Sequence, residues 1–154
     1  MFGKYKHSVD EKGRLFVPSK LRDELGSTFY VTLGLDHCLS VYSDESWAAF
    51  MARLKELSYN EVKKLRALFA YAADCEPDSQ GRILIPAKLR EYAGLTKEVV
   101  VVGSFDRAEI WSAERWAAIE NEAFSSGALE QAMGSCVSVE WLDLVTPLLD
   151  KKDE

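Results

Sequence analysis

One stretch of this chain occurs twice. Residues 10–22 read DEKGRLFVPSKLR and residues 78–90 read DSQGRILIPAKLR, with seven identical positions at an offset of 68. After one inserted residue the likeness continues, because residues 41–49 resemble residues 110–118. A repeat of this length predicts two copies of one supersecondary unit, which bury their apolar faces against each other.

Turn chemistry predicts the elements of the first copy. Asp10 and Gly13 suit the first and last places of a four-residue turn, because Asp accepts backbone hydrogen bonds and Gly tolerates positive φ. Residues 14–17 favour a short strand. Pro18 ends that strand and is preorganised for the first turn of a helix over residues 19–25. The second copy predicts the same plan: a turn at 78–81, a strand at 82–85, then a helix that stops at Gly94.

Alternating and helical patterns predict the remaining elements. Residues 4–9 alternate as a half-buried strand does, and residues 28–33 and 39–42 predict a hairpin. Ser43 and Ser58 suit helix N-caps. In the second copy, strands are predicted at 98–102 and 108–111, with a helix capped by Ser112. The predicted domains are a first module at 5–50, a helical connector at 51–73, a second module at 74–119 and a C-terminal helical segment at 120–154.

The size of each copy predicts how the copies pack. One copy spans about 45 residues, close to the lower limit for an independent core. We therefore expect the two copies to complete one another about a pseudo-two-fold axis. That packing would place Arg14 and Arg82 in equivalent positions, each just after a tight turn.

The charge distribution is uneven. The whole chain has a net charge of −6, which disfavours a polyanionic partner, yet residues 1–22 carry six bases against two acids. Residues 113–154 carry nine acids against three bases. A basic patch on an acidic body can still bind a polyanion, because its local field acts within a Debye length of about 8–10 Å.

Composition bounds the class of protein. With 47% hydrophobic residues in 154, a packed core is expected. No apolar run approaches a membrane span and no signal peptide is recognised at the start, so we expect a cytoplasmic protein without a membrane partner. The cysteines, Cys38, Cys75 and Cys136, lack metal-ligand spacing and are interpreted as buried or half-buried thiols. We predict no metal and no cofactor.

Catalytic patterns are absent from the sequence. His7 and His37 accompany no recognisable Ser or Cys nucleophile elbow. The sequence also lacks a Walker loop and a dinucleotide fingerprint. We therefore predict that the protein is not an enzyme and has no small-molecule substrate.

The two repeated motifs resemble those of the MraZ family, whose members contain two SpoVT/AbrB-type modules in tandem. The resemblance rests on residues 10–14 with Pro18 and on residues 80–86 with residues 89–95, at the family's usual separation. It implies an α+β fold in which two AbrB-like swapped-hairpin β modules form one pseudo-two-fold β-barrel with appended helices. It also implies a homo-oligomeric ring and a nucleoid-associated transcriptional regulator. Such a regulator would bind repeated sites in double-stranded DNA and repress its own division and cell-wall gene cluster.

The family's Asp-x-x-x-Arg pattern corresponds here to Asp10 with Arg14 and to Asp78 with Arg82. A guanidinium can bind O6 and N7 of guanine in the major groove, so we predict that both arginines read bases. We expect the aspartates to shape the turns and to orient the arginines. The plainer interpretation is a simple Asp–Arg ion pair within each turn, and the two interpretations are compatible.

Further basic residues divide into two groups. We predict that Lys6 and Lys12 contact phosphates, which gives affinity without sequence information. The second turn has Gln80 where the first has Lys12, so it brings less positive charge. His7 is ambiguous between strand packing and phosphate contact. An ordinary solvated face is at least as good an interpretation for the helix residues Lys20, Arg22, Lys88 and Arg90.

One alternative function belongs to a different class. The acidic C-terminal third contains Trp141, Leu142 and Leu144, which could form a docking segment. The protein would then be an antitoxin-like interaction scaffold that neutralises a protein partner.

Overall fold

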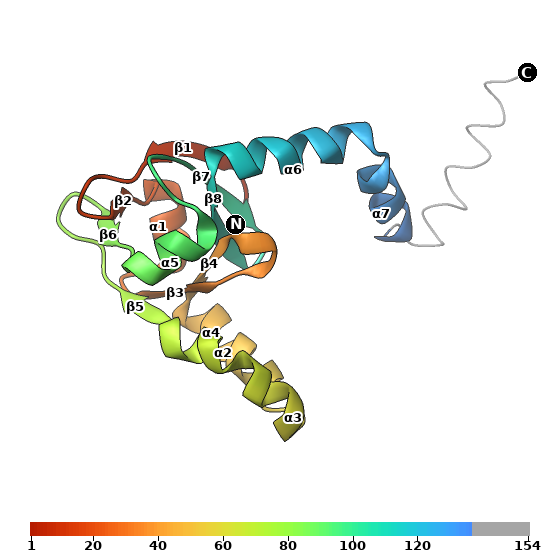
Figure 1. The fold of residues 1–154 in the computed structure, drawn as a ribbon, viewed down its shortest axis with the longest axis horizontal. Coiled ribbons are helices and arrows are strands. Elements are labelled where there is room, and N and C mark those ends of the chain that lie inside the picture. Colours follow the sequence, from red (N-terminus) through yellow and green to blue (C-terminus); the bar gives the residue numbers. More distant parts are fainter. Residues whose placement is uncertain (137–154) are drawn as a thin grey trace, which may run out of the picture. The chain divides into compact units, whose positions relative to one another are not determined.

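The computed structural model describes residues 1–136. The chain divides into two compact units, the first spanning Met1–Trp116 and the second beginning at Ala117. The first unit contains every strand of the described residues (Figure 1).

The first copy contains four strands and several short helices. The strands are β1 (Lys4–Ser8), β2 (Arg14–Phe16), β3 (Phe29–Leu33) and β4 (Leu39–Ser43). The helices are α1 (Ser19–Leu25), the 3-10 turn η1 (Leu35–His37), α2 (Asp44–Leu54), α3 (Tyr59–Val62), the 3-10 turn η2 (Lys63–Leu65) and α4 (Arg66–Tyr71). The predicted N-caps are confirmed, because the hydroxyls of Ser43 and Ser58 accept hydrogen bonds from the N–H groups of Ser46 and Glu61. The helix that begins after Ser58 is interrupted at η2 before α4.

The second copy repeats this order. Its strands are β5 (Ala73–Cys75), β6 (Arg82–Leu84), β7 (Glu98–Ser104) and β8 (Arg107–Ser112). Its first helix is α5 (Ala87–Ala93), and α6 (Ala113–Ser125) follows β8. In the second unit α6 continues and is followed by α7 (Ala128–Cys136). Strand β5 was not predicted, because three residues of mixed polarity give too short a pattern.

The two copies exchange strands in one antiparallel sheet of order β1-β7-β8-β4-β3-β5. Strand β1 of the first copy pairs with β7 of the second, and β5 of the second pairs with β3 of the first. Their hairpins meet at the centre, where β4 pairs with β8. This arrangement confirms an α+β fold built from two interlocked copies.

A separate two-stranded ribbon joins the two motifs. Strands β2 and β6 run antiparallel, with Arg14 opposite Leu84, Leu15 opposite Ile83 and Phe16 opposite Arg82. Because residues 14–16 and 82–84 correspond at the offset of 68, this register is symmetric about its central pair. The expected pseudo-two-fold relation between Arg14 and Arg82 is therefore present.

Closure of the sheet into a barrel stays a prediction. Within residues 1–136 the ladders leave β1 and β5 as the two edges of the six-stranded sheet, and β2–β6 forms a sheet of its own. An isolated antiparallel bridge between Val9, the residue after β1, and Leu15 of β2 joins the sheet to the ribbon.

One hydrophobic core holds the ribbon, the sheet and two helices together. Helices α1 and α5 each bury two residues in it, and the sheet adds alternating side chains from its central strands. Leu15 and Ile83 enter the same core from the ribbon. The ribbon is thus fixed on one face and leaves the other face to solvent.

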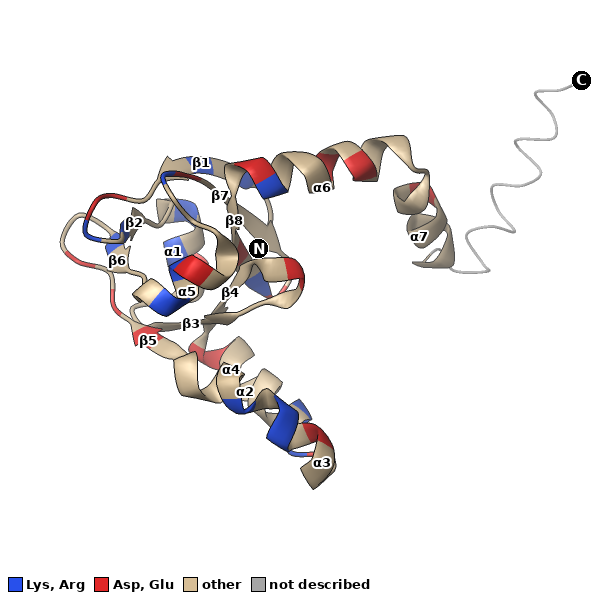
Figure 2. Ribbon diagram, in the orientation of Figure 1, with Lys and Arg blue, Asp and Glu red and all other residues tan. Residues whose placement is uncertain are grey.

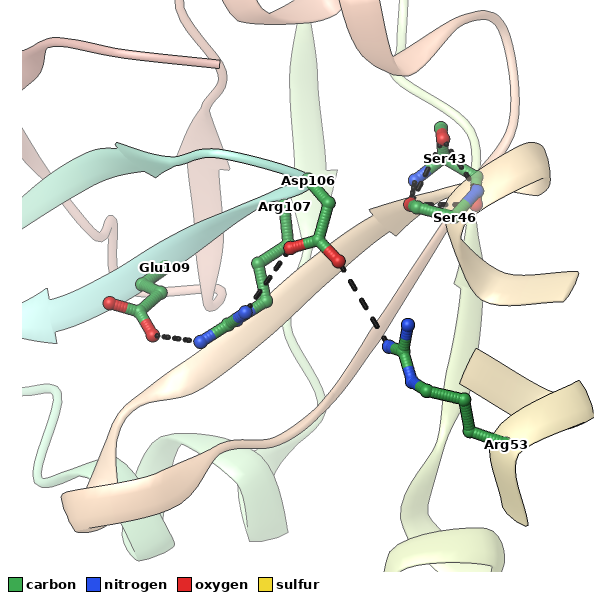
Figure 3. A network of polar contacts seen from close by, with 6 residues as sticks. All are labelled: Ser43, Ser46, Arg53, Asp106, Arg107 and Glu109. Carbon is green, nitrogen blue, oxygen red and sulfur yellow. Dashed lines mark hydrogen bonds and ion pairs between the residues drawn. The ribbon is translucent and has the colours of Figure 1, made fainter. Parts of the chain in front are cut away.

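The opposite face of the sheet carries aromatic and polar contacts. The rings of Tyr30 and Trp47 stack with centroids 4.9 Å apart, and those of Tyr42 and Phe50 stack at 5.2 Å. Figure 3 shows the polar network beside them: Arg53 of α2 approaches Asp106 at 4.0 Å, while Arg107 pairs with Asp106 and Glu109 at 3.2 and 3.3 Å. These contacts connect a helix of the first copy to a hairpin of the second.

The cysteine interpretation needs one correction. Cys38 and Cys75 are buried, and burial raises the pKa of their thiols to about 12 and about 11. Cys136, by contrast, is exposed; it lies on α7, in the second unit. Among residues 1–136, the helices are too short or too polar to cross a membrane.

Candidate nucleic-acid interface

The first turn is organised by the carboxylate of Asp10. Its Oδ1 accepts hydrogen bonds from the backbone N–H groups of Lys12 and Arg14, both at 2.9 Å. Its Oδ2 accepts from Nε of the Arg14 guanidinium at 2.7 Å. Gly13 closes the turn at φ 83°, with its N–H donating to the Asp10 carbonyl at 3.0 Å. One side chain therefore fixes both the turn backbone and the direction of Arg14.

The second turn repeats this geometry. Asp78 Oδ1 accepts from the N–H groups of Gln80 and Arg82 at 2.9 Å, and Oδ2 accepts from Arg82 Nε at 3.0 Å. Gly81 has φ 82°. The Asp–Arg ion pairs of the plainer interpretation are thus present in both turns, and they leave both terminal nitrogens of each guanidinium for other partners.

These hydrogen bonds favour the ionised carboxylates. The N–H of Arg14 is the largest contributor to a pKa of Asp10 below its ordinary value, and the N–H of Arg82 has the same effect on Asp78. The guanidinium of each turn adds to the lowering. Both turns are therefore held in their charged, hydrogen-bonded form at neutral pH.

Both arginines lie on the same face of the ribbon. Residues alternate across a strand, so Arg14 and Phe16 share the outer face with their partners Leu84 and Arg82. The Arg14 and Arg82 side chains are 34% and 28% exposed. Because β2 and β6 are antiparallel, the two turns lie at opposite ends of this three-residue ribbon. Arg14 and Arg82 are two residues apart along its axis, a spacing of about 7 Å.

Exposed lysines occur on β1 and in the first turn. They include Lys6 on β1 and Lys12 in the first turn. Figure 2 shows basic segments on β1 and in the turn before β2, whereas the turn before β6 contains acidic residues and no Lys or Arg. His7 instead packs its ring 5.2 Å from Phe16, and burial lowers its pKa. Of the two interpretations of His7, strand packing is the one that its contacts support.

The sequence alone did not distinguish Arg22 and Arg90 from the neighbouring helix lysines. Lys20 and Lys88 are exposed, as a solvated face requires, whereas Arg22 and Arg90 are half-buried. A Cβ on Gly13 would lie 2.7 Å from Cζ of Arg90, and one on Gly81 would lie 2.8 Å from Cζ of Arg22. The only sequence signal was the recurrence of both arginines in the repeated motif, which does not reveal that each crosses to the other copy.

One hollow, of about 540 Å³, lies away from this face and is lined by parts of the β3–β4 hairpin, α2 and α4. Its cations Arg53 and Arg107 face Asp106 and Glu109. Within residues 1–136, acidic, His and Cys side chains form no cluster of metal-binding size.

The geometry defines a class: an α+β protein of two interlocked repeats that presents two Asp-fixed arginines on one face of a β-ribbon. Comparison with known proteins agrees with this class. A family model described as "MraZ protein, putative antitoxin-like" matches twice, over residues 1–67 and 68–134. The chain therefore belongs to the MraZ family, and each matched repeat includes helices that follow its hairpin.

Curated relatives named "Transcriptional regulator MraZ" match most of the chain. The protein from Lachnoclostridium phytofermentans is 56% identical over 116 residues, which cover 74% of this chain and 82% of that protein. Those from Heliobacterium modesticaldum and Caldicellulosiruptor bescii are each 47% identical. Their matches cover 80% and 86% of this chain, and 89% and 96% of the respective relatives.

Proposed function

We propose that this protein is a DNA-binding transcriptional regulator that reads double-stranded DNA through Arg14 and Arg82. The observation that carries the proposal is the equivalent placement of both arginines on one solvent-facing side of the β2–β6 ribbon. The names of the curated relatives support the regulatory role.

The ion pairs favour base reading. Each aspartate accepts from Nε, so the two terminal nitrogens of the guanidinium can point away from the protein. A guanidinium held in this way can donate to O6 and N7 of guanine, a contact worth about 1–3 kcal/mol of discrimination per base pair. Two-stranded ribbons fit the major groove, so this mode requires no recognition helix.

Phosphate contacts supply the remaining affinity. Lys6 on β1 and Lys12 in the first turn are exposed and would neutralise phosphates without distinguishing sequences. Asp10 and Asp78 act within the protein, as supports of the turns and of the arginines. We assign the DNA-binding set to the residues Lys6, Asp10, Lys12, Arg14, Asp78 and Arg82.

Several subunits would be needed for strong binding. One subunit offers two arginine turns, and linked subunits on repeated sites gain affinity through effective concentration. By resemblance to its family, we propose a homo-oligomeric ring whose β modules close as pseudo-two-fold barrels. Such a ring would bind spaced, G-containing repeats and repress the division and cell-wall gene cluster, as a cytoplasmic, nucleoid-associated regulator.

A second candidate function is an antitoxin-like interaction scaffold. The family description contains that term, and α6 and α7 expose the apolar residues Phe124, Leu129 and Met133. The docking segment expected at Trp141, Leu142 and Leu144 lies outside the described residues. Copurification of a stoichiometric protein partner, together with absence of DNA binding, would favour this alternative.

The deciding experiment is selection from a random duplex library. Wild type would be compared with an Arg14→Ala/Arg82→Ala double variant, after both are shown to have equal stability and equal oligomer size. We expect wild type to enrich spaced, G-containing repeats and the variant to enrich nothing. If neither protein enriches a sequence, or both enrich the same one, the arginine mechanism is wrong.

A further inference from the structure

Each turn is supported by an arginine from the opposite copy. The guanidinium of Arg90, on α5 of the second copy, lies against the α-carbon of Gly13 in the first turn. The guanidinium of Arg22, on α1 of the first copy, lies in the same way against Gly81. Both glycines are buried, and in each turn the guanidinium of the other copy packs against the glycine on its buried side.

Backbone hydrogen bonds also connect each turn to the other copy. The carbonyl of Gly13 accepts a hydrogen bond from the N–H of Ile85 at 2.9 Å, and the carbonyl of Gly81 accepts from the N–H of Val17 at 2.9 Å. Each turn is therefore joined to the other copy by one backbone hydrogen bond and one guanidinium contact.

The crossing arginines also set the charge of each turn. Residues 10–14 contain two acids and two bases, and residues 78–82 contain one of each, so both turns are formally neutral. Arg90 and Arg22 each add one positive charge directly behind a turn. In a partly buried site this charge is screened less than one on an open surface.

We propose that Arg90 and Arg22 are positioning residues for DNA recognition, with Arg90 supporting the Arg14 turn and Arg22 supporting the Arg82 turn. This inference rests on the proposed function for its effect on DNA, but its crossed pairing can be measured without DNA. It predicts that neither module binds DNA alone, because each turn then lacks the supporting arginine that the other copy supplies.

The two supports differ in how firmly they are held. Nε of Arg22 donates to the Val17 carbonyl at 2.9 Å, and its Cζ lies 5.4 Å from the centre of the Phe16 ring. Nε of Arg90 is buried and has no hydrogen-bond partner among the described residues, and Leu84 replaces the aromatic ring. The Arg14 turn therefore has the looser support of the two.

Double-mutant cycles on DNA binding test the pairing. Alanine would be placed at Arg90 or Arg22, alone and combined with alanine at Arg14 or Arg82. We expect Arg90→Ala to weaken binding severalfold in wild type and much less once Arg14 is already alanine. Arg90 acts on Arg14 through the backbone of the turn, and residues coupled through a shared backbone shift interact by roughly two- to a hundredfold. In the Arg82→Ala background, by contrast, Arg90→Ala should weaken DNA binding by the same factor as in wild type. Arg22→Ala should show the opposite pattern.

Lysine variants separate support from charge alone. Arg90→Lys keeps the charge but loses the flat guanidinium that covers Gly13. We expect Arg90→Lys to regain the wild-type salt dependence of DNA binding, which Arg90→Ala loses. It should not regain the base preference that Arg14 reads. Lys88→Ala on α5 and Lys20→Ala on α1 are matched controls, because both lysines are exposed, and neither should show selective coupling.

NMR relaxation of the backbone amides gives the readout that does not depend on DNA. In Arg90→Ala, we expect order to fall in residues 10–14 and to stay unchanged in residues 78–82, with the reverse in Arg22→Ala. If each variant disturbs the turn of its own copy, or both turns equally, the inference is overturned. If the crossed loss of order appears but wild type binds no DNA, the crossed support stands and the proposed function fails.

Discussion

Leu15 lies directly opposite Ile83 at the centre of the β2–β6 ladder, and each side chain is 1% exposed. One residue comes from each copy, so the pair joins the two halves of the molecule beneath the candidate interface. Both belong to the core that contains α1, α5 and the central strands. The stability of this core and the placement of the two turns are therefore coupled.

We expect Ile83→Ala to lower the free energy of unfolding by about 2–5 kcal/mol, because it leaves a cavity where the packing cannot fully relax. Leu15→Ala should have an effect of the same size. Chemical denaturation followed by tryptophan fluorescence measures both.

Leu84→Ala is the matched control, since Leu84 is the next residue on β6 and is 60% exposed. A surface change of this kind should stay within about 0.5 kcal/mol. Two separate unfolding transitions for residues of the two copies would contradict a shared core.

Acid should lower the stability that the ionised carboxylates of Asp10 and Asp78 give to the folded protein. The pKa values of Asp10 and Asp78 are lowered in the folded protein, chiefly by backbone N–H groups. A lowered folded pKa contributes stability that is present above the unfolded value and is lost as pH falls below about 4. Asp10→Asn should therefore reduce stability at neutral pH and flatten its dependence on pH in the acid range.

Denaturation from pH 3 to 7 would measure this effect. Asp23→Asn removes an exposed carboxylate from α1 and controls for the loss of one negative charge. An acid dependence in Asp10→Asn equal to that of wild type would show that the carboxylate does not hold the turn.

An aromatic residue at position 84 should strengthen the support of the first turn. Phe16 lies beneath Arg22, whereas the equivalent Leu84 offers Arg90 no ring. Leu84→Phe would recreate the first copy's arrangement, and a cation–π contact at such a site contributes about 0.5–1 kcal/mol.

The gain should disappear when Arg90 is replaced, so Leu84→Phe would be measured in wild type and in Arg90→Ala. Thermal unfolding gives both differences. An equal gain in the two backgrounds would assign it to apolar burial alone.

Local chemistry made part of this structure predictable. The turns, the Asp–Arg pairs and the N-caps depend on residues within four positions of one another, so their signals are complete in a short window. The repeated motif, with its constant offset of 68, then predicted that Arg14 and Arg82 would be equivalent. The structure confirms that equivalence through the symmetric ribbon.

Contacts between the copies were not predictable in the same way. Arg90 and Gly13 lie far apart in sequence, and nothing local distinguishes an arginine that crosses the core from one on a solvated face. Strand β5 exists because β3 offers it an edge, not because residues 73–75 have a strand pattern. Cys136 was misjudged for a related reason, since burial depends on which part of the fold covers a residue.

The second turn should accept a gain of positive charge. Gln80 stands where the first turn has Lys12, and it is the backbone N–H of Gln80, not its side chain, that bonds to Asp78 at 2.9 Å. Gln80→Lys should therefore keep the turn intact and add one phosphate contact. The plot of log affinity against log salt should steepen by about 0.9, while the preferred DNA sequence stays the same. Lys12→Gln is the matched reverse and should flatten the plot by a similar amount. A changed base preference in either variant would mean that position 80 or 12 touches bases, and an unchanged slope in both would remove these turns from the DNA interface.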